Sequence, residues 1–140
     1  MAMEQVSVFI ENRPGRLAEI LHFMAQQNID LRAYSFAESS DFGIMRMLVR
    51  DTDAALAALK NGGYTARKND VLAMLVADET GSTVEAFRLL GQAGISVEYT
   101  YAFALGQGKD AIILLRVDDN DKAEKILETA KVRLVNGQNF

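Results

Sequence analysis

Apolar residues alternate with polar or smaller ones at the start of the chain, at Val6, Val8 and Ile10. This period of two predicts a half-buried strand. After the segment ENRPG at 11–15, apolar positions recur every three or four residues from Leu17 to Met24. The change of period predicts an amphipathic helix with Pro14 in its first turn, where the missing N–H of proline costs nothing.

Residues 29–68 complete this pattern. Alternation at 29–38, a turn at SSDFG and a strand at 44–50 predict a hairpin. A second helix is predicted from the capping residues 51–53 to the glycine pair 62–63, and a short strand follows at 64–68. The predicted order is βαββαβ.

The second half repeats the first. An offset of 66 residues pairs Gly15 with Gly81 and Glu19 with Glu85, and after the hairpin turn an offset of 68 pairs Asp51 with Asp119. A two-residue insertion around 106–108 accounts for the change of offset. We interpret the chain as two domains, 1–69 and 70–140, joined at Asn69 and Asp70 without a Pro- or Ser-rich linker. The alternative is a single irregular α/β domain whose halves have similar composition.

A βαββαβ unit forms a four-stranded antiparallel sheet with both helices on one face. The predicted fold class is therefore α+β, with two ferredoxin-like βαββαβ units packed side by side. A thin core in each half is the physical reason to expect close packing, because neither half is large enough to bury much surface alone.

Composition narrows the possible chemistry. The chain of 140 residues has no cysteine and a single histidine, His22, so thiol nucleophiles, thiolate zinc sites and His–His metal pairs are excluded. We predict no catalytic residues, no metal site and no cofactor. The net charge of −4 with scattered basic residues argues against nucleic acid as a partner, and no apolar run is long enough to span a membrane. We expect a cytoplasmic protein.

Several polar features have simple structural explanations. The acidic run 118–121 lacks the glycine and glutamate of a calcium loop and is expected to cap a helix. Glu19 and Glu85 are expected to interact favourably with the helix dipole rather than to carry out acid–base chemistry. His22 is expected at the surface, and Gly106–Gly108 at a hairpin turn.

The segment ENRPGRL is the best candidate for binding chemistry. A strand ends there, Gly15 permits close approach of a ligand, and the free N–H groups of a helix start suit a carboxylate or phosphate. The Asn12 amide can both donate and accept hydrogen bonds. The second copy has Asp78 in place of Asn12 and retains Gly81. The alternative is a helix start that binds nothing.

These features resemble the ACT-domain family of βαββαβ regulatory modules that bind amino acids and control metabolic enzymes. The resemblance covers the whole chain as two consecutive modules. It rests on residues 12–17 after an apolar strand, on QQNIDL at 26–31, and on the more diverged Asp78, Gly81 and QAGISV at 92–97.

The resemblance implies two unequal ligand sites between the modules. One is formed by Asn12, Arg13, Pro14, Gly15, Arg16 and Leu17 facing Ser96 and Val97, and the other by Asp78, Gly81, Ser82 and Thr83 facing Asp30 and Leu31. Asp78 with Asp30 suits an ammonium or a cationic side chain, whereas Asn12 with Ser96 is neutral.

The resemblance also implies a function. We expect a non-catalytic regulatory module that binds a free amino acid, of polar or cationic type, and acts on a separate enzyme or regulator, as a homodimer. The alternative is an interaction or assembly module whose loops bind no ligand.

Overall fold

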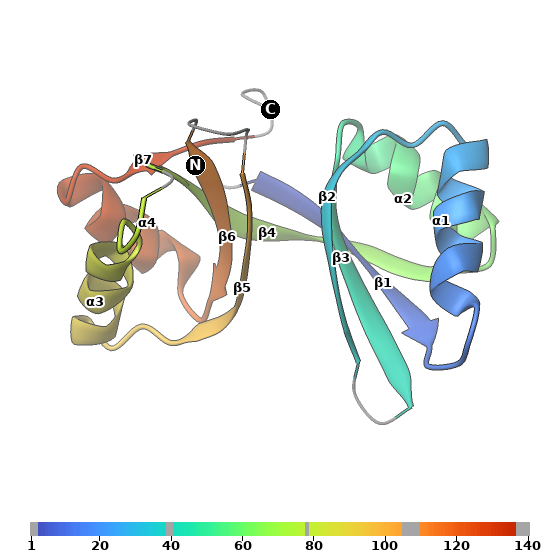
Figure 1. Cartoon of the computed structure of the whole chain (residues 1–140), viewed down its shortest axis with the longest axis horizontal. Helices are drawn as coiled ribbons and strands as arrows, with labels where there is room; N and C mark the ends of the chain where they lie inside the picture. The colour runs from blue at the N-terminus through green and yellow to red at the C-terminus, as the bar shows by residue number, and fades with distance from the viewer. Residues whose placement is uncertain (1–2, 39–40, 78, 105–109, 137–140) are drawn as a thin grey trace. The chain divides into compact units, whose positions relative to one another are not determined.

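The computed structural model describes residues 3–38, 41–77, 79–104 and 110–136, which contain seven strands and four helices (Figure 1). In chain order these are β1 Met3–Glu11, α1 Arg16–Gln26, β2 Leu31–Glu38, β3 Phe42–Val49, α2 Thr52–Asn61, β4 Thr65–Val76, α3 Val84–Gln92, β5 Val97–Ala104, β6 Ala111–Val117, α4 Asn120–Thr129 and β7 Arg133–Leu134. Contacts between Cα atoms divide the chain into a first unit, Glu4–Asn69, and a second unit, Asp70–Phe140 with Met1–Met3.

The first unit is a sheet of strand order β2-β3-β1-β4 with α1 and α2 on one face (Figure 1). β3 is antiparallel to both β1 and β2, with Val6 opposite Met47. The apolar residues of β1 and of the helices form one core, as their spacing predicts. Its buried members are Val6, Val8, Ile10, Ile20, Met24, Met45, Met47, Leu59 and Ala66.

The second unit repeats this arrangement. β4 pairs with β6 and with the short β7, β5 pairs with β6, and α3 and α4 cover one face (Figure 1). A separate core lies between sheet and helices, and its buried members are Leu72, Met74, Ala86, Leu90, Ile95, Ile113, Leu115, Val117, Ala123 and Leu127. The predicted fold class, α+β with ferredoxin-like units, is confirmed.

β4 corrects the prediction at the junction. Two strands were expected there, at 64–68 and again near 72–76, but a single strand runs over Thr65–Val76. Its residues 65–69 belong to the first unit and 70–76 to the second. Asn69 and Asp70 are poor strand formers by composition, which is why the pattern alone suggests a break.

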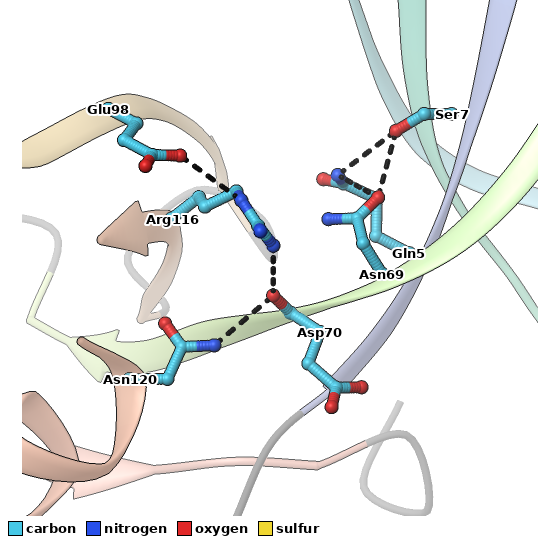
Figure 2. Close-up of polar contacts among 7 residues, drawn as sticks. All are labelled: Gln5, Ser7, Asn69, Asp70, Glu98, Arg116 and Asn120. Atoms are coloured by element: carbon cyan, nitrogen blue, oxygen red, sulfur yellow. Dashed lines mark hydrogen bonds and ion pairs between the residues drawn. The ribbon is translucent and has the colours of Figure 1, made fainter. Parts of the chain in front are cut away.

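Hydrogen bonds satisfy both junction residues within the strand, as Figure 2 shows. Asn69 Oδ1 accepts a hydrogen bond from the Ser7 hydroxyl at 3.0 Å and from Gln5 Nε2 at 3.4 Å, both side chains of the first unit. The main-chain oxygen of Asp70 accepts from Arg116 at 3.1 Å and from Asn120 at 3.3 Å, both of the second unit. These partners hold the two junction residues within one strand.

Two smaller predictions, for Asp119 and His22, agree with the described residues. Asp119 is the N-cap of α4, and its carboxylate accepts a hydrogen bond from the N–H of Lys122 at 3.0 Å. His22 is exposed. Gly106–Gly108 lie outside the described residues. No helix among the described residues has the length and apolar character needed to cross a membrane.

Candidate functional site

The loop between β1 and α1 forms a type II β-turn. The N–H of Arg16 donates to the carbonyl oxygen of Arg13 at 3.3 Å, and Gly15 has φ 88° and ψ −14°. Those angles belong to the third residue of a type II turn, where glycine is favoured after proline. Pro14 therefore lies in the turn, ahead of a helix that begins at Arg16, and its predicted place in the first helical turn is wrong. The left-handed conformation of Gly15 separates proline from helix.

The loop between β4 and α3 repeats this turn without proline. The N–H of Ser82 donates to the carbonyl oxygen of Glu79 at 3.2 Å, and Gly81 has φ 80°. α3 then begins at Val84, whereas the repeat would start it at Ser82. Thr83 occupies the N-cap position and makes no side-chain hydrogen bond to cap the helix. Asp78 lies outside the described residues.

The basic side chains of the first loop and of the start of α1 are paired with nearby carboxylates. Arg13 Nε lies 3.1 Å from the Glu11 carboxylate, and Arg16 Nη1 lies 2.6 Å from that of Glu19. The hydrogen bond to Glu19 raises the pKa of the Arg16 guanidinium, which also lies 5.7 Å from the ring centroid of Tyr64. An anionic ligand would have to compete with these carboxylates for Arg13 Nε and Arg16 Nη1, whereas the buried Arg16 Nε has no hydrogen-bond partner among the described residues.

The second loop has the opposite charge. In the repeat, Glu79 takes the position of Arg13 and Ser82 that of Arg16. Ser82 and Thr83 are half-buried and Glu79 is exposed. The N–H groups of the first turn of α3 add partial positive charge beside the two hydroxyls. This loop therefore offers hydrogen-bond donors for a carboxylate and one acidic group for an ammonium.

A pocket of about 340 Å³ lies at this second loop, inside the second unit. The loop and the ends of β4, β5 and β6 line it, through Val76, Ala77, Glu79, Ser82, Thr83, Ala102, Phe103, Ala104, Ala111 and Ile113. Ligand pockets range over roughly 300–1,000 Å³ and combine apolar walls with a few polar groups. The size and lining of this pocket suit a small polar molecule with an apolar part.

The starts of the two second strands have equivalent backbone bonds and different side-chain partners. The carbonyl oxygen of Asp30 accepts from the N–H of Arg50, and that of Ser96 from the N–H of Asp118, both at 3.2 Å. The Asp30 carboxylate lies 3.2 Å from Arg50 and 3.4 Å from Arg32. A ligand ammonium would compete with two guanidinium groups for this carboxylate. The side chains of Leu31 and Val97 pack against the cores of their own units.

The structure brings together some of the predicted residues. Residues 12–17 share one turn and helix start, and Gly81, Ser82 and Thr83 share the other, with Ser82 and Thr83 in the pocket wall. The predicted facing of each loop with a second-strand start of the other unit stays a prediction.

The apolar half of the pocket was not predicted. Ala102, Ala111 and Ile113 come from the hairpin of β5 and β6, far along the chain from the loop. The sequence carries one signal for them, because the repeat aligns Ala102 with Phe36 and Ala111 with Gly43. Such size changes at aligned positions indicate where one copy has space that the other lacks.

The repeated glutamates have structural partners. Glu19 pairs with Arg16, which precedes it, and Glu85 forms a two-pronged ion pair with Arg88, one turn further along α3. The hydrogen bonds from Arg88 lower the pKa of the Glu85 carboxyl. Over the described part of the chain, no three acidic or histidine side chains cluster as metal ligands would.

Comparison with known proteins identifies relatives over the whole chain. The family model described as an ACT domain pair matches residues 1–140. Protein BT0572 from Bacteroides thetaiotaomicron has a similar structure, with 35% identity and a TM-score of 0.88 over 96% of this chain and 92% of that one. A comparison with curated proteins gives no significant match.

Two more distant structures share the fold alone. The regulatory subunit of aspartate kinase from Thermus thermophilus is 17% identical, with a TM-score of 0.62 over 91% of each chain. That from Thermus flavus is 16% identical, with a TM-score of 0.63 over 89% of this chain and 88% of that one.

Proposed function

This chain belongs to the family of ACT domain pairs, and from that membership and the pocket of its second unit we propose that it is a non-catalytic regulatory module for a free amino acid. The ligand binds at the second strand-to-helix loop. Its carboxylate meets the hydroxyls of Ser82 and Thr83 and the start of α3, and its ammonium lies toward Glu79.

The pocket is the observation that carries this proposal. It combines a helix start, two hydroxyls and an acidic side chain with an apolar wall, and a free amino acid presents the complementary carboxylate, ammonium and side chain. Burial of apolar atoms against the wall adds about 25 cal/mol per Å² removed from water. The polar groups then orient the ligand.

Regulation requires a second protein. We propose that the chain, as a homodimer, changes its contacts with a separate enzyme or regulator when the amino acid binds. Such a change requires that the ligand bind one conformation more tightly than another. The aspartate kinase subunits that share the fold are regulatory subunits, which makes an enzyme the first candidate for the partner.

An assembly module without a ligand is the second candidate, and exposed aromatic side chains favour it. Tyr34 and Phe42, on the hairpin of the first unit, are 48% and 52% exposed. Large exposed apolar side chains are frequent at protein contacts.

A thermal-shift screen against the twenty amino acids at millimolar concentration separates the two candidates. A specific rise of the melting temperature with one amino acid or one chemical class supports the proposed function, since a ligand that binds only the folded state stabilises it by mass action. Size-exclusion chromatography with light scattering then measures whether the ligand changes the oligomeric state. A flat response to all twenty contradicts amino-acid binding and leaves assembly as the remaining candidate.

A further inference from the structure

The hairpins of the two units are paired in the same register. In the second unit Ala102 lies opposite Ile113, and Ala111 lies opposite Val76. The repeat offsets of 66 and 68 give the corresponding pairs in the first unit as Phe36 with Met45 and Gly43 with Ile10. The backbone is therefore equivalent at this place, and only the side chains differ.

In the first unit the ring of Phe36 lies on Gly43. A Cβ atom built on Gly43 would be 2.3 Å from Cζ and 2.4 Å from Cε2 of this ring, closer than any real contact. With a larger residue at position 43 the ring would have to move from this place. The backbone of Gly43 is buried, and Phe36 is 37% exposed, so the ring covers this part of the sheet.

In the second unit two methyl groups stand at the same place. Ala102 replaces Phe36, Ala111 replaces Gly43, and both line the pocket of about 340 Å³. The exchange of a ring and a hydrogen for two methyl groups removes the side chain that fills the first unit at this position.

We infer that Phe36 is a plug that closes the first unit, so that the chain takes its amino acid only in the second unit. This inference rests on the proposed function. The charges agree with it, because the first loop has Arg13 and Arg16 already paired with carboxylates, whereas the second offers Glu79 to an ammonium. The apolar wall at Ala102 and Ile113 selects a small zwitterion with a short aliphatic side chain.

The test exchanges the two residue pairs between the units. Ala102→Phe with Ala111→Gly builds the plug into the second unit, and the glycine removes the clash that the phenylalanine alone would meet. Thr100→Tyr is the matched control, because it also transfers a first-unit aromatic to β5 but lies outside the pocket wall. Phe36→Ala with Gly43→Ala removes the plug from the first unit.

Isothermal titration calorimetry with the amino acid that gives the largest thermal shift measures affinity and stoichiometry. The native chain should bind one molecule, the Ala102→Phe/Ala111→Gly chain should bind at least about tenfold more weakly, and the Thr100→Tyr chain should bind as the native one does. The Phe36→Ala/Gly43→Ala chain should keep the native affinity in the second unit and gain a second binding event in the first, because the plug is removed. Methyl NMR should show the ligand shifting Ile113 rather than its counterpart Met45.

Three results would overturn the inference. Native affinity in a folded Ala102→Phe/Ala111→Gly chain, or a ligand-induced shift at Met45 in place of Ile113, shows that the amino acid binds elsewhere while the proposed function stands. Binding of two molecules by the native chain shows that Phe36 does not close the first unit. If no amino acid binds the native chain, the proposed function and the inference fail together.

Discussion

Lys131 adopts a left-handed backbone conformation at the end of α4, with φ 63°, at the position where the repeat has Gly63 after α2. After the first helix of each unit, the first copy has the residue with a side chain, Asn28 at φ 55°, and the second copy has the glycine, Gly94 at φ 75°. Side chains with a Cβ are strained in this region, and lysine more so than asparagine.

Replacing Lys131 with glycine should raise the free energy of unfolding by about 1 kcal/mol, because the strain at φ 63° disappears. The N–H of residue 131 keeps its hydrogen bond to the Glu128 carbonyl, since that bond is made by the main chain. Urea denaturation measures the change. The reciprocal Gly63→Lys should lower stability by a similar amount, and a loss of stability in Lys131→Gly would contradict the prediction.

Glu85 should titrate below the ordinary range of a glutamate, because hydrogen bonds from Arg88 lower its pKa. A carboxyl whose pKa is lower in the folded state stabilises that state above its unfolded pKa, and this contribution disappears as the pH falls through the folded pKa. NMR titration of the Glu85 side-chain carbon measures the midpoint. Arg88→Gln should return it to the ordinary range, and an unchanged midpoint in that variant would assign the shift to another cause.

At the scale of elements, β4 is the main difference between sequence and structure. The alternating pattern predicts both ends of this strand but not its continuity through Asn69 and Asp70. Their hydrogen-bond partners are side chains far away in sequence, and Asp70 accepts through its main-chain oxygen, so no local pattern reveals these bonds. Continuity here depends on tertiary contacts.

Asn69→Ala should cost about 1–3 kcal/mol, because it removes the acceptor of the buried Ser7 hydroxyl and one of the hydrogen bonds of the buried Gln5 amide. Asp70→Ala is the matched control, since Asp70 accepts its hydrogen bonds through the main-chain oxygen, and it should change stability by less than about 0.5 kcal/mol. Chemical denaturation of both variants compares them. Equal effects would mean that the Asn69 side chain has no special part in the strand.

A second exchange of ring and glycine lies between the helices of the first unit. A Cβ atom on Gly62 would be 2.5 Å from Cζ of Phe23, whose ring packs on Tyr64 with the centroids 5.3 Å apart. The second copy has Leu89 and Ala130 at these positions. The two copies thus have the same backbone at this place but distribute side-chain volume differently between the two positions.

Gly62→Ala should destabilise the chain by about 1–3 kcal/mol through overpacking against Phe23. The double change Phe23→Leu with Gly62→Ala should recover most of that loss, because it copies a pair that the second unit already packs. Thermal unfolding of the single and double variants gives the coupling energy. Additive effects would show that the ring and the glycine are independent.

At the scale of the whole molecule, the repeat was the most predictable feature. The apolar periods of two and 3.6 give the element order, and the offsets of 66 and 68 pair residues whose hydrogen bonds are equivalent in the structure. The two strand-to-helix turns could be located through Gly15 and Gly81, which have positive φ in the structure, and their role in binding stays a prediction. The apolar pocket wall was not predicted, because it depends on the sizes of side chains that face each other across a hairpin. The period of apolar residues carries no information about those sizes.

The domain ranges 1–69 and 70–140 remain a prediction, and so does their dependence on each other for folding. Each half has its own buried core, which favours independent folding. β4 contributes residues to both halves, which opposes independent folding. Separate expression of the two ranges, with folding followed by circular dichroism, decides between these influences.

Ligand binding should protect the two units unequally against hydrogen exchange. At about 100 times its dissociation constant, an amino acid bound in the second unit should stabilise that unit by about 2.7 kcal/mol and slow the exchange of α3, β5 and β6. The amides of α1, β2 and β3 serve as the internal control. Mass spectrometry of the exchanged peptides measures both, and equal protection throughout would contradict a site confined to the second unit.

The ring on Gly43 also bears on how the response depends on concentration. Two open pockets in one chain would allow the first molecule bound to alter the affinity for the second, and the response could become steep. A chain with one pocket closed by Phe36 can only saturate along a simple hyperbola. Any steepness would then have to come from association between copies of the chain.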